Sequence, residues 1–192
     1  AIMESKTIMT KFPDLFRHSW LTGTNFEGNF VVCGFPHVIQ HLRGSLNKMQ
    51  ITSQLLPVKY GFHTELIDPI EEEFKQLSRK IHLSPIRIPI ISSSSRTGIV
   101  EELNENYLWG AIRYRVNFQQ TVNRILEKGE YIFIDAGPSG TLATCVKYML
   151  SSDSSSISLQ MINQFGRDSD AIEKLRLCSF SNVASSEFLN EL

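Results

Sequence analysis

The sequence predicts an α/β protein that begins with a small α+β subdomain. Two observations predict this fold class: the first sixty residues alternate as strand, helix, strand, strand, helix and strand, and apolar strands further along are each followed by a helix. With 192 residues, 42% of them hydrophobic, the chain can bury a core in one or two domains. We expect three parts: residues 1–60, residues 61–150, and a serine-rich loop with a C-terminal extension at 151–192.

The first part is predicted to have a ferredoxin-like order of elements. After a short apolar strand at the start, the expected elements are a helix over Lys6–Phe16, strands over Ser19–Thr24 and Asn29–Cys33, a helix over His37–Leu46 and a strand over Ile51–Lys59. Gly28 tolerates the positive backbone angle that a tight turn between the two middle strands requires. This βαββαβ order is that of a ferredoxin-like unit. Because its faces are thin, we expect the unit to lean on a larger piece.

The second part is predicted to alternate helices with buried strands. The expected elements are helices over Glu65–Lys80, Asn104–Arg113, Asn117–Lys128 and Thr141–Leu150, strands over Ile86–Ile91 and Tyr131–Asp135, and a polar loop over Ser92–Gly98. Past the serine-rich run, a strand over Ser158–Asn163 and a helix over Asp170–Leu177 complete the pattern. Strands that alternate with helices are typical of an α/β sheet covered on both faces, so we interpret these as the edge of such a sheet. Its other strands are expected outside this sequence.

Charge and cysteine content narrow the functional classes. Lys and Arg total 19 against 20 Asp and Glu, so the chain lacks the basic excess that favours nucleic acid or anionic lipid. The three cysteines, Cys33, Cys145 and Cys178, show no Cys-x-x-Cys spacing, which argues against a disulfide framework. No apolar run approaches the ~20 residues that span a bilayer. We expect a cytoplasmic protein without nucleic-acid or membrane partners, cut from a longer chain because no initiator Met is present.

His63 is the residue whose position points most directly to chemistry. It follows Gly61, where the backbone can turn between a predicted strand and a predicted helix. A histidine titrates near neutral pH, so at a strand end it can act as a general base. From the residues alone, a half-buried histidine that caps the helix is the commoner interpretation. His37 and His41 have metal-ligand spacing on a helix, but without a third ligand in range the sequence predicts no metal site.

Four stretches between residues 25 and 142 point to a known family. They are Asn25–Gly34; Leu56–Val58 with Gly61–Thr64 and Leu66–Pro69; Tyr107–Trp109 with Ile112–Phe118; and Phe133–Leu142. In order and spacing they resemble the malonyl-CoA:acyl-carrier-protein transacylases and the acyltransferase domains of polyketide synthases. The longer run Gly137–Thr144, followed by Val146–Tyr148, further resembles the stand-alone acyltransferases of bacterial trans-acting polyketide pathways.

The resemblance implies a serine–histidine dyad in an α/β-hydrolase-like large subdomain, roofed by the ferredoxin-like small subdomain. His63 would take the proton of the serine and return it to the departing thiol, while the backbone carbonyl of Ala111 orients the imidazole. Phe62 and Gly61 would border the acyl group, and Asn25 would face the cleft. The resemblance implies no cofactor: a coenzyme A thioester is a substrate, and an acyl carrier protein is the partner.

The family's nucleophile is not found in these 192 residues. The family carries its serine in a Gly-His-Ser-x-Gly elbow, its oxyanion glutamine in Pro-Gly-Gln-Gly and its malonate-binding arginine shortly after the elbow, and none of the three occurs here. The nearest match, Gly137–Thr141, has Thr141 where an elbow needs a small residue. We therefore expect Ser139 to cap a helix, the nucleophile to lie in a missing N-terminal half, and this chain alone to be inactive.

Three functions are compatible with the sequence. The leading one is part of an acyltransferase that moves a malonyl-type group from coenzyme A to an acyl carrier protein in polyketide or fatty-acid biosynthesis. The alternatives are an acyl hydrolase that removes stalled acyl groups from carrier proteins, and a noncatalytic carrier-protein-binding fragment. The family arginine would separate transferase from hydrolase, because an uncharged acyl chain needs no guanidinium partner. The ferredoxin-like order also permits RNA binding, which needs a basic surface with aromatics on its central strands. The charge balance of this chain disfavours that function.

Overall fold

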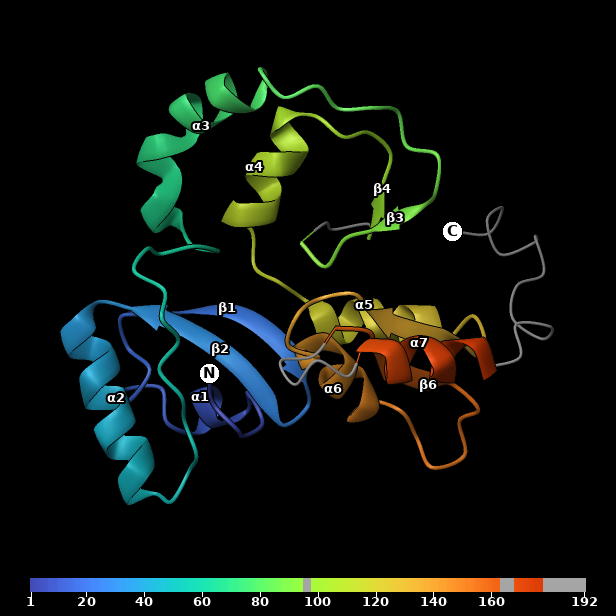
Figure 1. Ribbon diagram of the computed structural model, residues 1–192. Coiled ribbons are helices and arrows are strands. Elements are labelled where there is room, and N and C mark those ends of the chain that lie inside the picture. The colour runs from blue at the N-terminus through green and yellow to red at the C-terminus, as the bar shows by residue number, and fades with distance from the viewer. Residues whose placement is uncertain (95–97, 163–167, 178–192) are drawn as a thin grey trace. The chain divides into compact units, whose positions relative to one another are not determined.

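The computed structural model describes residues 1–94, 98–162 and 168–177, and their contacts divide the chain into two units, Ala1–Thr121 and Val122–Leu192 (Figure 1). Residues 163–167 and 178–192 of the expected serine-rich loop and C-terminal extension therefore lie outside the described residues, Cys178 among them. The three-part division drawn from the sequence stays a prediction about subdomains.

The first unit is built on an antiparallel sheet in the ferredoxin-like order. Strands β1 (Ser19–Phe26) and β2 (Asn29–Gly34) pair antiparallel, from Ser19 opposite Gly34 to Phe26 opposite Asn29. Ile2 forms an antiparallel bridge with Phe30 of β2 on one side and with Ser53 on the other. The four segments thus lie in the order fourth, first, third, second along the chain, which confirms the predicted βαββαβ unit.

Two helices, α1 (Ile8–Lys11) and α2 (Pro36–Lys48), contribute side chains to the hydrophobic core beside this sheet (Figure 1). The buried cluster consists of Ile2, Ile8, Phe16, Phe30, Leu42 and Leu46. The side chains of Phe30 and Leu46 are fully enclosed, and each such burial contributes about 1.5–3 kcal/mol to folding. The core therefore holds both helices to a sheet whose outer strands are very short.

Two elements of this part are shorter than the sequence predicts. The helix expected over Lys6–Phe16 ends at Lys11, because Phe12 precedes Pro13 and a residue before proline is kept out of the helical region. The strand expected over Ile51–Lys59 is reduced to the bridge at Ser53. Its backbone hydrogen bonds join Thr52 to Met3 and Gln54 to Ala1.

The remainder of the first unit joins this sheet through Val116. The Thr24 N–H donates to the Val116 carbonyl, and the Val116 N–H donates to the Thr22 carbonyl, each over 2.9 Å. These bonds add a parallel bridge alongside Gly23 of β1. The segment that leads into Val116 is consequently registered against β1 by backbone hydrogen bonds.

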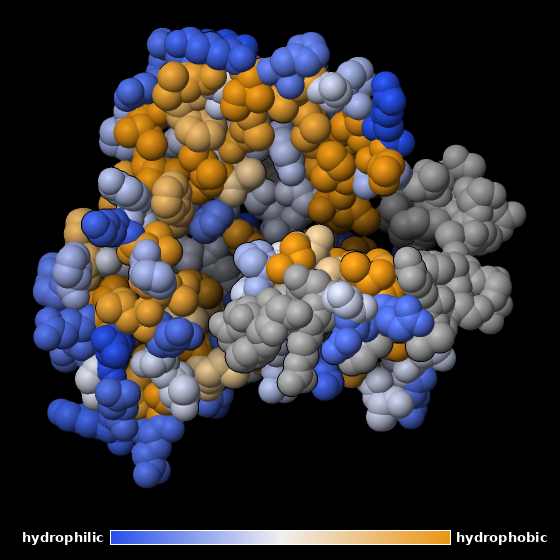
Figure 2. Space-filling view, viewed as in Figure 1, coloured by the Kyte–Doolittle hydropathy of each residue, from blue (hydrophilic) through white to orange (hydrophobic). Residues whose placement is uncertain are grey.

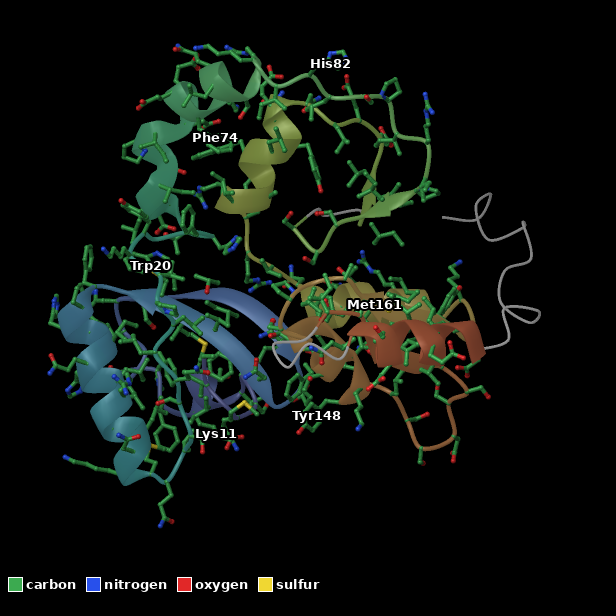
Figure 3. All side chains as sticks on the ribbon, viewed as in Figure 1. Lys11, Trp20, Phe74, His82, Tyr148 and Met161 are labelled. Carbon is green, nitrogen blue, oxygen red and sulfur yellow. The ribbon has the colours of Figure 1, made fainter. Side chains whose placement is uncertain are left out.

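Helices pack together between residues 65 and 113. A 3₁₀ helix, η1 (Glu65–Ile70), leads into α3 (Glu71–Ser78), and α4 (Glu105–Arg113) packs against α3. Phe74 of α3 and Trp109 of α4 meet with ring centroids 5.7 Å apart, and Figure 3 shows Phe74 between the two helices. The single helix expected over Glu65–Lys80 is wrong in its first turn, because Pro69 has no N–H and restricts the residue before it.

Two very short strands complete the first unit. β3 (Ile90–Ile91) pairs antiparallel with β4 (Ile99–Val100), a strand that the sequence did not predict. The strand expected over Ile86–Ile91 begins only after Pro89, which cannot donate to a ladder. Figure 2 shows hydrophobic residues gathered over the part that carries α3, α4 and this pair. Exposed apolar residues in that stretch include Leu77, Ile81 and Ile88, and an apolar surface of this kind is typical of a region that contacts another protein segment.

The second unit is a parallel strand pair with helices. Helix α5 (Phe118–Leu126) crosses the boundary between the units, and the elements after it are β5 (Ile132–Asp135), α6 (Thr141–Lys147), β6 (Ile157–Gln160) and α7 (Asp168–Leu177). β5 and β6 run parallel, with Ile132 opposite Ile157 and Asp135 opposite Gln160. Parallel pairing is what strand–helix alternation predicts, so the α/β interpretation of this part is confirmed.

Helix α6 is capped by Asp135 rather than by Ser139. One carboxylate oxygen of Asp135 accepts the N–H groups of Leu142 and Ala143, each at 3.0 Å, and the other accepts the Gly137 N–H at 2.8 Å. The Ser139 hydroxyl instead contacts the Thr141 hydroxyl. The prediction that Ser139 caps the helix is therefore wrong, because Gly140 occupies the N-cap position in left-handed backbone.

None of the described helices is long and apolar enough to cross a membrane.

Candidate active site

His63 lies in a tight loop that leads into η1. Its backbone is left-handed, with φ of 63°, a conformation that costs a non-glycine residue about 1–2 kcal/mol. The His63 N–H donates to the carbonyl of Ile112 in the last turn of α4, over 2.8 Å. The main chain of His63 is thereby attached to α4.

Thr64 closes this loop from within. Its side chain is buried, and its hydroxyl donates to the Gly61 carbonyl at 2.7 Å while accepting the Leu66 N–H at 3.1 Å. A Cβ at position 61 would lie 2.8 Å from the Cβ of Leu66, closer than real contacts allow. Gly61 is therefore required for the loop to fold back on η1, apart from any contact that it makes with substrate.

The imidazole of His63 is oriented by a backbone carbonyl. Its Nδ1 lies 2.9 Å from the carbonyl oxygen of Tyr114. A carbonyl only accepts hydrogen bonds, so a neutral ring in this contact carries its proton on Nδ1 and leaves the lone pair on Nε2. This is the tautomer that a general base needs if Nε2 is to take a proton.

The orienting carbonyl is not the one that the sequence predicts. Ala111 was the expected position, and the structure instead brings Tyr114 to the ring. Ala111 lies inside α4, where carbonyls point along the helix axis. Tyr114 is the first residue past the helix and is extended, with φ −88° and ψ 150°, so its carbonyl turns out of the axis.

Two side-chain pairs connect η1 to its surroundings. The indole N–H of Trp20 on β1 donates to Glu65 at 2.5 Å, and Figure 3 shows Trp20 where β1 begins. Arg113 forms a forked ion pair with Asp68, in which its Nε meets one carboxylate oxygen and its Nη2 meets the other at 3.2 Å. The hydrogen bond that Arg113 donates to Asp68 raises the pKa of Arg113. Hydrogen bonds from its own N–H and from the Trp20 indole lower the pKa of Glu65.

The sequence analysis assigns no role to the ion pair between Asp68 and Arg113. Both residues fall in stretches that carry the family resemblance. An acidic residue soon after His63 and a basic residue just before Tyr114 were the sequence features that could indicate this pair. Whether the two side chains meet depends on where α4 ends in space, which the sequence does not show.

Relatives of this chain are acyltransferases of polyketide biosynthesis. It is 33% identical over 168 residues to the polyketide biosynthesis acyltransferase homolog PksD of Bacillus subtilis (strain 168), a match that covers 88% of this chain and 52% of that protein. It is 32% identical over 177 residues to the homolog BaeD of Bacillus velezensis, covering 91% of this chain and 54% of that protein. The chain thus spans about half the length of these relatives. No family model matches it.

These homologues are acyltransferases of polyketide biosynthesis, the family that the sequence motifs resemble.

Solved structures of acyltransferases share the fold. A loading acyltransferase from the avermectin polyketide synthase superposes with a TM-score of 0.77 at 18% identity, over 91% of this chain and 57% of that one. A malonyl CoA-acyl carrier protein transacylase from Clostridium perfringens gives 0.71 at 17% identity, over 100% of this chain and 58% of that one. At these identities the likeness establishes the α/β fold of the acyltransferase family alone.

The other residues expected at the acyltransferase site have clear positions. Phe62 is 36% exposed, and its ring meets Tyr60 edge to face at a centroid distance of 6.1 Å. Asn25 lies on β1 and donates from its side-chain amide to Asn29 at 2.7 Å. The structure therefore brings Gly61, Phe62 and His63 into one loop and places Asn25 on the sheet. The roles assigned to them by the resemblance stay predictions.

The remaining candidates show no chemistry of their own. His37 and His41 are exposed on α2, and no group of three or more His, Cys, Asp or Glu in the described part of the chain has metal-site geometry. Cys33 is half-buried, and burial raises the pKa of its thiol, which disfavours the reactive thiolate.

Proposed function

We propose that this chain carries the histidine base of an acyltransferase that moves a malonyl-type group from coenzyme A to an acyl carrier protein. The observation that carries the proposal is the contact between His63 Nδ1 and the Tyr114 carbonyl, which leaves Nε2 as the proton acceptor. The match to polyketide acyltransferases supports the reaction class. The helix-cap interpretation of His63 has less support, because Thr64 is the residue whose side chain caps η1.

In the proposed reaction, His63 Nε2 takes the proton of a serine hydroxyl as its oxygen attacks the thioester carbonyl. The tetrahedral intermediate collapses, the carbon–sulfur bond breaks, and the imidazolium returns the proton to the departing coenzyme A thiol. The carrier-protein thiol then gives its proton to Nε2 and attacks the acyl-serine. When that intermediate collapses, the proton returns to the serine. Each half-reaction leaves His63 neutral, ready for the next.

The serine is proposed to come from a segment outside these residues. That segment is the missing N-terminal half of the acyltransferase, which would act as the partner of this chain. Beside the sequence pattern, exposed apolar side chains support such a partner. They follow one another along the approach to His63: Leu55, Leu56, Val58, Tyr60 and Phe62. An exposed run of this size is typical of a surface that another segment covers.

Phe62 is proposed to border the acyl group. A bulky ring next to the reacting thioester leaves little room for a branch at the α-carbon, which favours malonyl over α-methyl-branched groups. One methyl group in a pocket discriminates by only ~1–3 kcal/mol, so this selectivity is expected to be real but modest.

The decisive experiment replaces His63 in the complete acyltransferase. His63→Ala is expected to slow malonyl transfer to the carrier protein by about a thousandfold or more, because general-base assistance to a serine is worth that much. His63→Asn is the companion variant, since asparagine tolerates left-handed backbone but cannot act as the base. Turnover and folding are followed together, by transfer of radiolabelled malonyl and by circular dichroism.

His82→Ala is the matched control, because His82 is exposed and follows the C-terminal end of α3. Figure 3 shows Trp20 near the opposite end of that helix. Full turnover in both His63 variants would refute the proposed base. If the unaltered enzyme hydrolyses acyl-carrier thioesters faster than it transfers malonyl, the acyl hydrolase replaces the transferase as the function.

A further inference from the structure

We propose that the Asp68–Arg113 ion pair positions the His63 imidazole by fixing the backbone that presents the Tyr114 carbonyl to it. This inference rests on the proposed function, in which His63 is the base. Asp68 and Arg113 are positioning residues in this scheme, because they act through the backbone of Tyr114 rather than on the acyl group.

The position of Arg113 in the chain carries the first step. Arg113 is the last residue of α4, and Tyr114, whose carbonyl receives the imidazole, follows it directly. Carbonyls at a helix C-terminus have no partner within the helix, so their direction depends on what restrains the departing chain. The Arg113 side chain provides such a restraint one residue before the carbonyl that matters.

The position of Asp68 carries the second step. Asp68 lies in η1, the turn that begins directly after the His63–Thr64 loop. The ion pair and the imidazole thus join the same two segments. One is the His63–Thr64 loop with η1, and the other is the end of α4. Together with the bond from the His63 N–H to Ile112, the ion pair and the imidazole contact give three links between these segments. A shift of η1 along α4 would have to break all three.

The geometry of the pair is that of a positioning contact. Both carboxylate oxygens of Asp68 are engaged by two different nitrogens of a planar guanidinium, which fixes orientation as well as distance. The Arg113 side chain is only 23% exposed. At the opposite end of α4, Arg79 meets Glu105 through a single short contact of 3.1 Å from a half-exposed side chain. That second pair ties α4 to the end of α3 but lies a helix length from Tyr114.

The first arm of the test reads the imidazole directly in this chain. ¹⁵N-histidine NMR of the neutral ring is expected to show His63 protonated on Nδ1. Asp68→Asn and Arg113→Lys should each lower the ratio of the Nδ1–H to the Nε2–H tautomer by about threefold or more, the scale of one weakened hydrogen bond. Glu105→Gln removes one negative charge, as Asp68→Asn does, but at the end of α4 that is far from Tyr114. It should leave the tautomer ratio unchanged. The remaining histidines serve as internal references in the same spectra.

The second arm measures catalysis in the complete acyltransferase. Asp68→Asn and Arg113→Lys are expected to lower kcat by about tenfold with little change in KM, since a slightly misplaced base slows chemistry more than binding. Glu105→Gln should retain the kcat of the unaltered enzyme. If Asp68→Asn lowers stability, Arg113→Lys, which keeps the charge and loses only the fork, decides the outcome.

The outcomes separate this inference from the function on which it rests. An unchanged tautomer ratio in both variants, or an equal change in Glu105→Gln, would overturn the positioning role even if His63→Ala abolishes transfer. A changed ratio with full activity in His63→Ala would uphold the positioning role and overturn the proposed base.

Discussion

His63 combines a proposed role as a base with a strained backbone. The left-handed region is open to glycine and tolerable for asparagine, whereas other side chains crowd the following carbonyl there. The strain is offset locally by the bond to Ile112 and by the imidazole contact with Tyr114. Each of these is worth about 0.5–1.5 kcal/mol net, so the loop is balanced rather than strongly stabilised.

Substitutions at position 63 should therefore rank by backbone rather than by size. His63→Ala, His63→Gly and His63→Asn all lose the imidazole contact, but only alanine keeps the left-handed strain. We expect His63→Asn to be more stable than His63→Ala by about 1 kcal/mol, with glycine between them because it also loses more entropy on folding. Urea unfolding of the three variants, followed by tryptophan fluorescence, measures the order. Equal midpoints for alanine and asparagine would show that the loop relaxes.

At this scale the sequence identifies the proposed base more readily than the group that orients its ring. His63 could be found because its neighbours Gly61, Phe62 and Thr64 are local in the chain. The Tyr114 carbonyl could not, because which carbonyl turns toward the ring depends on where α4 ends to within one residue. Backbone groups carry no sequence signature of their own.

At the scale of elements, prolines explain most differences between expectation and structure. Pro13 ends α1, Pro69 divides the expected helix after His63, and Pro89 delays β3. Helices without an interior proline, such as α4 and α2, were predicted to within a few residues. Asn104 caps α4 as its side chain accepts the N–H groups of Asn106 and Tyr107, a pattern that the sequence displays openly.

The start of α6 depends on a carboxylate from the preceding strand. Asp135→Ala removes the acceptor of three backbone N–H groups and should destabilise this helix start by about 1–2 kcal/mol. Hydrogen exchange at the Leu142 and Ala143 amides is the direct measurement, and it should quicken by about tenfold. Asp153→Ala, on the serine-rich loop, is the matched control and should leave both amides protected. Unchanged exchange in Asp135→Ala would mean that the Ser139–Gly140 turn alone starts the helix.

At the scale of the whole molecule, the strand pairing fits the proposal that this chain works with a further acyltransferase segment. Two parallel strands, β5 and β6, form a sheet that normally exists only inside a larger covered one. The ferredoxin-like order was predictable because it is set by local alternation within sixty residues. The β5–β6 pairing joins strands on either side of α6, and the sequence indicated it only through the alternation of strands with helices, whereas β4 was not predicted.

Incubation of the isolated chain with radiolabelled malonyl-CoA tests this view of the whole molecule. We expect no stable labelling, because His63 has no elbow serine to activate within these residues and loss of either dyad member removes several orders of magnitude in rate. The complete acyltransferase is the positive control and should become labelled on serine. Labelling of Ser139 in the isolated chain would place the nucleophile here after all.

The left-handed backbone at His63 also bears on how descendants of this gene change. Under the proposed function, selection for acyl transfer retains the histidine against its own conformational preference. In a duplicated copy released from that selection, asparagine at position 63 relieves the strain, and a single nucleotide change converts a histidine codon into an asparagine codon. The lost imidazole contact and the relieved strain are of similar size, so this change costs little stability, and lapsed copies should lose this residue sooner than the rest of the loop.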